Sequence, residues 1–133
     1  MTEGIALHWR LLPGRYNLKG TECGNCGAKF FPARRICSHC RRKGKIKDVK
    51  YSGLGEIYTY TIVRSPSTGF EFQKPFALAV IKLVEGPLVT AQVVDCDIRD
   101  VAIGKKVKAA FRKIIADGDE GIIRYGYKFR LVN

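Results

Sequence analysis

The sequence predicts a mainly β protein in which short N-terminal helices and a rubredoxin-like zinc ribbon precede a five-stranded OB-fold barrel. Three observations support this fold class. Two Cys-x-x-Cys pairs stand ten residues apart in the first third of the chain. From Tyr51 onward, β-branched and aromatic residues recur in strand-like runs that turn residues separate. With 133 residues, 46% of them hydrophobic, the chain is long enough to bury a core.

The N-terminal segment predicts a short docking helix. Ile5, Trp9 and Leu12 stand at positions i, i+4 and i+7, which places them on one helical face. The pair Pro13-Gly14 is expected to end this pattern. Because such a short helix is unstable alone, we assign residues 1–20 to N-terminal docking helices.

The cysteine spacing predicts a metal site in residues 21–48. Cys23 and Cys26 form one knuckle and Cys37 and Cys40 the other, which is the spacing of a zinc ribbon. A rubredoxin-type iron site or an iron–sulfur cluster would use the same ligands. Four thiolates fill a tetrahedral shell and leave no position for substrate, so the zinc is expected to be structural. A redox role would need one Cys-x-x-Cys beside a βαβ unit, and the segment has no such pattern.

The remaining residues, 49–133, predict five strands and hence a small barrel. Glycines at the bends and only about ten residues between the third and fourth strands suit an OB fold, with an SH3-like barrel as the alternative. The expected strands are Glu56–Arg64, Phe76–Val84, Leu88–Asp95, Lys106–Ile115 and Ile122–Leu131.

Alternation along the strands predicts which side chains share a face. In the last strand the apolar residues from Ile123 to Leu131 alternate with Arg124, Gly126, Lys128 and Arg130, which predicts one apolar and one basic face. In the first strand, Tyr58 and Tyr60 share a face with Ile62. The loop from Ser65 to Lys74 is expected to expose Phe70 and Phe72.

Positive charge is concentrated at the N-terminal end of the chain. Residues 1–50 contain 12 Lys and Arg against 3 Asp and Glu, a net of +9, whereas residues 51–133 contain 12 against 9, a net of +3. This imbalance predicts a negatively charged partner, such as nucleic-acid phosphate, the phosphates of a nucleotide-like cofactor such as coenzyme A, or an acidic protein surface. A basic surface that serves only solubility is the remaining alternative.

The sequence favours binding or scaffolding over catalysis. It has no nucleophile with a base, no phosphate-binding glycine loop and no evident pair of catalytic carboxylates, since Asp95, Asp97 and Asp100 suit a solvated turn. It also lacks a bilayer-length apolar run and a signal-peptide core, so we expect a cytoplasmic protein without membrane contact. Single-stranded nucleic acid could stack on Tyr58, Tyr60, Phe70 and Phe72. An adaptor for an enzyme of acyl-CoA metabolism is the other hypothesis.

Several short motifs, weak one by one but specific in their order, give the chain a family resemblance. It resembles the zinc-ribbon plus OB-fold proteins associated with acyl-CoA enzymes, long catalogued as a domain of unknown function. Ala33 stands where that family usually has a second proline. The motifs are Trp9-Arg10, Arg15-Tyr16, Cys23-x-x-Cys26-Gly27, Phe31-Pro32-Ala33-Arg34, the segment from Gly53 to Thr61, Pro75 to Ala79, Gly104 to Val107 and Tyr125 to Phe129.

The resemblance implies a non-catalytic partner of thiolase-fold enzymes. The sequence resembles the archaeal members that accompany acetoacetyl-CoA thiolase and hydroxymethylglutaryl-CoA synthase in the mevalonate pathway of isoprenoid biosynthesis. In such a hetero-oligomeric complex this chain would bridge the two enzymes, and coenzyme A or an acyl-CoA is a further possible ligand. The expected contacts to an acidic partner surface or to coenzyme phosphates are Arg34, Arg35, Arg41 and Arg42.

Overall fold

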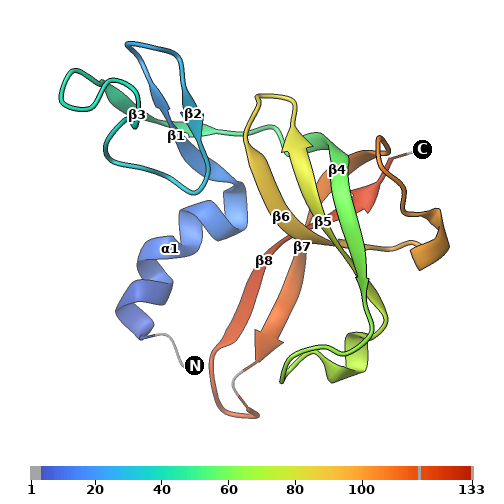
Figure 1. Ribbon diagram of the computed structural model, residues 1–133. Helices are drawn as coiled ribbons and strands as arrows, with labels where there is room; N and C mark the ends of the chain where they lie inside the picture. Colours follow the sequence, from blue (N-terminus) through green and yellow to red (C-terminus); the bar gives the residue numbers. More distant parts are fainter. Residues whose placement is uncertain (1–3, 117, 133) are drawn as a thin grey trace.

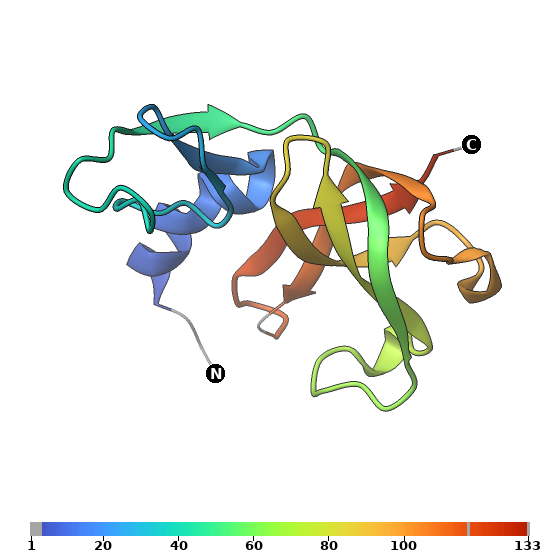
Figure 2. The same ribbon diagram turned by 45° about the horizontal axis from the view of Figure 1, so that its top comes forward.

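The computed structural model describes residues 4–116 and 118–132 of the chain. These residues form a helix, a three-stranded sheet and a closed five-stranded barrel, as the sequence predicted for a mainly β protein (Figure 1). The helix and the small sheet lie together at one side of the barrel (Figure 2). The part of the chain up to Lys50 therefore builds a module of its own that packs against the barrel.

The N-terminal segment differs from its prediction. Instead of several short helices, its described residues form one helix, α1 (Ile5–Asn17), which continues through Pro13. The helix ends at Leu18, whose left-handed backbone (φ 50°) lets its N–H bond the Gly14 carbonyl at 3.1 Å. Proline removes only one helical hydrogen bond, and the last turn is held by other contacts, including the edge of the Tyr16 ring on Phe111.

The predicted apolar face of α1 is largely uncovered. Ile5 and Trp9 are each 74% exposed, and Leu12 is half-buried. The helix instead contacts β1 (Lys19–Cys23) and β8 (Ile123–Leu131). Ile5 and Trp9 therefore do not pack on the part of this chain that the structure describes, and their docking on a partner stays a prediction.

The small sheet carries the cysteine segment. Its strands are β1 (Lys19–Cys23), β2 (Lys29–Phe30) and β3 (Ile46–Lys50), in the order β2-β1-β3 with both pairs antiparallel. The first knuckle connects β1 to β2, and the second lies between β2 and β3. The sheet thus brings the two knuckles to one end.

The barrel has the strand order β4-β5-β6-β8-β7, and β7 closes it against β4. All pairs are antiparallel except β6 with β8, which run parallel. This is the topology of an OB barrel, so the OB prediction is confirmed over the SH3-like alternative. The strands are β4 (Leu54–Val63), β5 (Phe76–Leu83), β6 (Leu88–Val94), β7 (Lys106–Ala116) and β8 (Ile123–Leu131). All of them begin and end within one or two residues of their predicted ends. Two short 3-10 helices, η1 (Glu71–Gln73) and η2 (Ile98–Asp100), lie in the loops.

The two faces of β8 depart from simple alternation of apolar-in and basic-out. Phe129 is completely buried and Arg130 is exposed, as predicted. Lys128, however, is only 7% exposed, and Gly126 is also buried. The predicted basic face is therefore partly inside the molecule, because Gln73 bonds Lys128 and accepts from Gln92, while Ile114 and the Arg15 carbonyl lie beside Gly126.

One apolar core runs from the barrel into the small sheet. Tyr51, on the connection between β3 and β4, is 3% exposed and belongs to the same buried cluster as Ile57, Ile81 and Phe129. Its hydroxyl donates to the Phe30 carbonyl at 2.9 Å and lies 3.2 Å from the Thr21 carbonyl. Tyr51 thereby ties the edge of the small sheet to the barrel core.

Candidate metal centre and basic surface

The two knuckles have the same local backbone geometry. The N–H of Gly27 bonds the Cys23 carbonyl at 2.8 Å, and the N–H of Arg41 bonds the Cys37 carbonyl at 2.9 Å. Both donors have a left-handed backbone, with φ 75° at Gly27 and φ 51° at Arg41. Each turn points its two cysteine side chains in one direction.

The four predicted ligands meet at one point. Their sulfur atoms all lie within 4.8 Å of one another, and the Sγ atoms of Cys26 and Cys37 are 3.5 Å apart. A tetrahedral zinc with bonds of about 2.3 Å needs sulfur separations of about 3.8 Å. Cys23 and Cys37 are completely buried. The donor set therefore fits a closed zinc site that is structural in character.

Hydrogen bonds from nearby N–H groups favour thiolates at the cluster, whereas the neighbouring sulfurs oppose the ionisation of Cys26. The Cys40 N–H donates to the Cys37 Sγ at 3.3 Å, and the Asn25 side-chain amide donates to the Cys40 Sγ at 3.2 Å. The Cys26 N–H lowers the pKa of the Cys23 thiol to about 6. The Ala28 N–H also lowers the pKa of Cys26, but the neighbouring thiols, Cys40 first, raise it to about 12. Negative charges on sulfurs so close together repel one another, and a bound divalent cation offsets that repulsion, so all four cysteines can bind as thiolates.

The four predicted arginines are all exposed, but they have different surroundings. The guanidinium of Arg34 lies 5.3 Å from the centre of the Phe30 ring, and the backbone N–H of Arg34 donates to the Thr21 hydroxyl. Arg35 lies 4.0 Å from Asp48. Arg41 and Arg42 directly follow the second knuckle. The surface is basic, as predicted, and its contacts to a partner stay a prediction.

A cleft of about 460 Å³ separates α1 from the small sheet. Of the four predicted arginines, only Arg35 lines it. Sequence reasoning missed the other cations there, Arg10, Arg15 and Lys19, because they share a surface only after the helix has packed on the sheet. Asp48 is the one acidic residue among the described residues that line the cleft, so its lining is strongly positive.

The predicted aromatic surface is only partly assembled. Tyr58 and Tyr60 are 57% and 38% exposed, and Phe72 is fully exposed. A register shift between Ile57 and Thr59 turns Tyr58 outward next to the buried Ile57. Phe70 is half-buried against Phe76, with ring centres 6.4 Å apart, so the predicted exposure of Phe70 is wrong.

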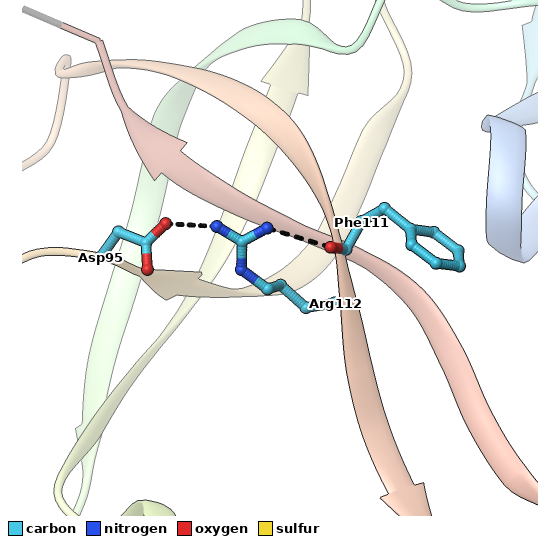
Figure 3. Close-up of polar contacts among 3 residues, drawn as sticks. All are labelled: Asp95, Phe111 and Arg112. Carbon is cyan, nitrogen blue, oxygen red and sulfur yellow. Dashed lines mark hydrogen bonds and ion pairs between the residues drawn. The ribbon is translucent and has the colours of Figure 1, made fainter.

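The acidic residues after β6 serve the local structure. Asp95 forms an ion pair with Arg112, whose guanidinium also donates to the Phe111 carbonyl at 3.0 Å (Figure 3). Asp97 accepts the Arg99 N–H at 3.0 Å and so caps η2. These contacts agree with the solvated-turn interpretation of the cluster. Within residues 4–116 and 118–132, no helix has the length and apolar character that crossing a bilayer requires.

Fold and site together define a protein in which a rubredoxin-like zinc ribbon is joined to an OB-fold barrel. Two family models agree with this: the rubredoxin-like zinc ribbon domain of ChsH2 matches residues 12–45, and the C-terminal OB-fold domain of ChsH2 matches residues 48–112. The chain belongs to the family of DUF35 domain-containing scaffold proteins, as its similarity to curated relatives shows.

Three archaeal relatives carry the name DUF35 domain-containing scaffold protein. The chain is 45% identical to the one from Methanothermobacter thermautotrophicus, over 98% of this chain and 97% of that protein. It is 49% identical to the one from Methanocaldococcus jannaschii, over 95% and 89%. Identity to the one from Pyrococcus furiosus is 41%, over 95% and 91%.

Two solved structures share the fold. A chain of the Ltp2-ChsH2(DUF35) aldolase matches with a TM-score of 0.71 and 22% identity, over 98% of this chain and 96% of that one. A DUF35 family protein of unknown function from Sulfolobus solfataricus matches with a TM-score of 0.57 and 20% identity, over 87% and 76%. The helix, zinc ribbon and barrel are thus a recurrent arrangement.

Proposed function

We propose that this chain is a non-catalytic cytoplasmic scaffold that bridges acetoacetyl-CoA thiolase and hydroxymethylglutaryl-CoA synthase of the mevalonate pathway. The observation that carries the scaffold role is the near full-length similarity to three proteins named as scaffolds. The choice of these two enzymes rests on the resemblance to archaeal members that accompany them. The chain would supply binding surfaces and leave the chemistry to its partners.

A bridge of this kind has a physical advantage. The Claisen condensation of two acetyl-CoA molecules is unfavourable, so its product accumulates only if the next enzyme removes it. Holding the two active sites in one assembly raises the effective concentration of that product at the second site. No new catalytic group is required on the scaffold.

Two exposed surfaces support the docking role. The zinc-ribbon side carries Arg34, Arg35, Arg41 and Arg42 at the surface and suits an acidic protein face or the phosphates of coenzyme A. The helix α1 presents Ile5 and Trp9, which this chain leaves uncovered. Large apolar side chains exposed next to each other are typical of protein interfaces.

Co-purification from the native host, followed by mass spectrometry of the accompanying proteins, tests the proposal. We expect a stoichiometric complex with a thiolase-fold enzyme, and no thiolase, synthase or thioesterase activity of the isolated chain. Absence of binding to both purified enzymes at micromolar concentrations would contradict the proposed partners.

A double charge reversal tests the basic surface. Arg34→Glu with Arg35→Glu should weaken the complex while zinc content and the circular-dichroism spectrum stay unchanged, because both side chains are exposed. Lys105→Glu with Lys108→Glu, at exposed barrel positions, changes net charge equally and serves as the control. Equal weakening by both pairs would show that net charge, and not this surface, drives binding.

Single-stranded nucleic acid is a second candidate ligand, favoured by the exposure of Tyr58, Tyr60 and Phe72. Phosphate-driven binding weakens steeply with salt. We expect only weak, sequence-independent binding in a fluorescence assay, lost near physiological salt. Tight and salt-resistant binding would make nucleic acid the first candidate.

A further inference from the structure

A pocket of about 590 Å³ lies between the β7–β8 hairpin and the loop that precedes β5, with β6 beside it. This volume is within the range of small-molecule sites. Much of its apolar lining comes from three strands and the loop, namely Val63, Phe70, Phe76, Leu78, Ile114 and Ile115. None of the four cysteines lines the pocket, and the pocket adjoins the cleft beside α1, with which it shares Arg15 and Tyr127.

Lys128 is a buried charge in the lining of this pocket. The residue is only 7% exposed, and its Nζ donates a hydrogen bond to the Gln73 Oε1 at 3.2 Å. The same oxygen accepts from the Gln92 amide at 3.0 Å. An ammonium has three N–H donors, and the described part of the chain provides this one acceptor. Lys128 therefore has donors left for a ligand.

The charged residues among the described lining of the pocket are all basic. Arg15 and Arg124 join Lys128 in the lining, and none of the described lining residues is acidic. Burial, and next the positive charge of Arg112, lower the pKa of Lys128. Asp95 neutralises Arg112 but does not line the pocket (Figure 3). An anion bound in the pocket would satisfy the buried ammonium and offset this repulsion.

We propose that the pocket binds a small amphipathic carboxylate, with its hydrocarbon chain against the apolar lining and its carboxylate at the Lys128 ammonium. A neutral ligand of the same shape would leave the ammonium without a counter-charge. An ion without a hydrocarbon part would leave the apolar lining exposed to water. This site goes beyond the proposed scaffold function and does not depend on it.

Octanoate and 1-octanol, which share a chain length and differ in charge, are the probes for this site. In titration calorimetry and ¹H–¹⁵N NMR, octanoate should bind and shift the signals of Gln73, Gln92 and Lys128. Because a hydrogen bond to a charged group contributes about 1.5–3 kcal/mol, 1-octanol should bind about tenfold more weakly or worse. Octanoate that shifts no pocket signals at millimolar concentration, or equal binding of the two probes, would overturn the proposal.

Lys128→Met shortens the unbranched side chain by one heavy atom and removes the charge. It should reduce octanoate affinity about tenfold, to that of 1-octanol. Lys113→Met, at an exposed position of the same hairpin outside the pocket lining, should leave the affinity unchanged. Equal losses in the two variants would overturn the assignment. If Lys128→Met does not fold, the wild-type signal shifts and the octanol comparison decide the question alone.

The test separates this inference from the proposed function. A chain that forms the enzyme complex but ignores octanoate would refute only the pocket assignment. A chain that binds octanoate through Lys128 but no thiolase-fold enzyme would refute only the proposed partners.

Discussion

Gly27 and Arg41 occupy equivalent positions in the two knuckles, yet only one of them is glycine. Both residues have a left-handed backbone, which any side chain beyond glycine makes less favourable. The first knuckle therefore has the unstrained form of the turn, and the second accepts a small energetic cost at Arg41. Nothing in the surrounding contacts explains why the second knuckle keeps an arginine there.

Gly27→Ala should reduce the free energy of unfolding by about 1 kcal/mol. The reason is backbone strain alone, because a Cβ at Gly27 would meet no atom within 4 Å. Urea unfolding of the zinc-loaded protein measures the loss. Gly24→Ala, in the same knuckle without a left-handed backbone, would make only ordinary contacts with Lys45 and is the control. Equal losses at both glycines would exclude the strain explanation.

Lys128→Met should make the protein more stable at neutral pH. Burial lowers the folded-state pKa of Lys128 below its unfolded value, so the unfolded state binds more protons in the window between those two pKa values. Below that window the buried charge of Lys128 lowers the free energy of unfolding of the wild-type protein by its full amount. As the pH rises through the window, this destabilisation disappears. Unfolding measured from pH 7 to pH 10 should show the advantage of the variant shrinking. A constant difference would contradict this linkage.

The residues that could be predicted are those whose role is encoded locally. The four cysteines were found because two knuckles need ligands at fixed short spacings, whatever the rest of the fold does. Lys128 could not be found in this way, since strand alternation placed it on a solvent face. Its burial depends on Gln73 and Gln92, which only the folded barrel brings beside it.

The zinc ribbon depends on its metal, because apart from its cysteines the small sheet contributes little apolar surface of its own. Chelation should unfold at least residues 20–45, since structural zinc supplies roughly 10–16 kcal/mol of folding free energy. Hydrogen exchange detects the unfolding, and elemental analysis should find one equivalent of metal per chain. Cys40→Ser should reproduce the effect of chelation, whereas Cys96→Ser, outside the cluster, should keep the zinc. Purified protein with well below one equivalent would contradict the assignment.

The connection between small sheet and barrel depends on the Tyr51 hydroxyl. Tyr51→Phe should lower the free energy of unfolding by about 1–2 kcal/mol, because the buried Phe30 carbonyl loses its donor. Tyr58→Phe, at a hydroxyl on an exposed side chain, should change it by less than about 0.5 kcal/mol. Thermal unfolding of both variants checks the difference. Similar changes in the free energy of unfolding of the two variants would show that the Tyr51 hydrogen bond makes no net contribution to stability.

Strands were easier to predict than the helix. Alternation and turn residues located all five barrel strands, because each strand is half-buried by the same closed sheet. The end of α1 was misjudged at Pro13, since local propensity disfavours an internal proline and ignores the ring contact of Tyr16 on Phe111. Tertiary contacts decided the length of that helix.

Over the whole molecule, charge and fold divide the chain in the same place. The strongly basic residues 1–50 contain the helix and the small sheet, and residues 51–133, whose charges nearly balance, contain the barrel. If the basic side meets an acidic enzyme, raising salt from about 0.05 M to about 0.5 M should slow association far more than it speeds dissociation. Stopped-flow mixing with the partner enzyme measures both rates. The Arg34→Glu, Arg35→Glu variant should show a flatter salt dependence, and an unchanged slope would contradict electrostatic steering.

The continuous core around Tyr51 also has a consequence for geometry. Two modules joined by a flexible linker would let bound proteins sample many separations and orientations. Here the ring of Tyr51 sits in the barrel core while its hydroxyl bonds the Phe30 carbonyl of the ribbon, so the modules turn as one body. Proteins held at opposite ends of this chain would therefore keep one mutual orientation, and the route between their active sites would have the same length in every copy of the assembly.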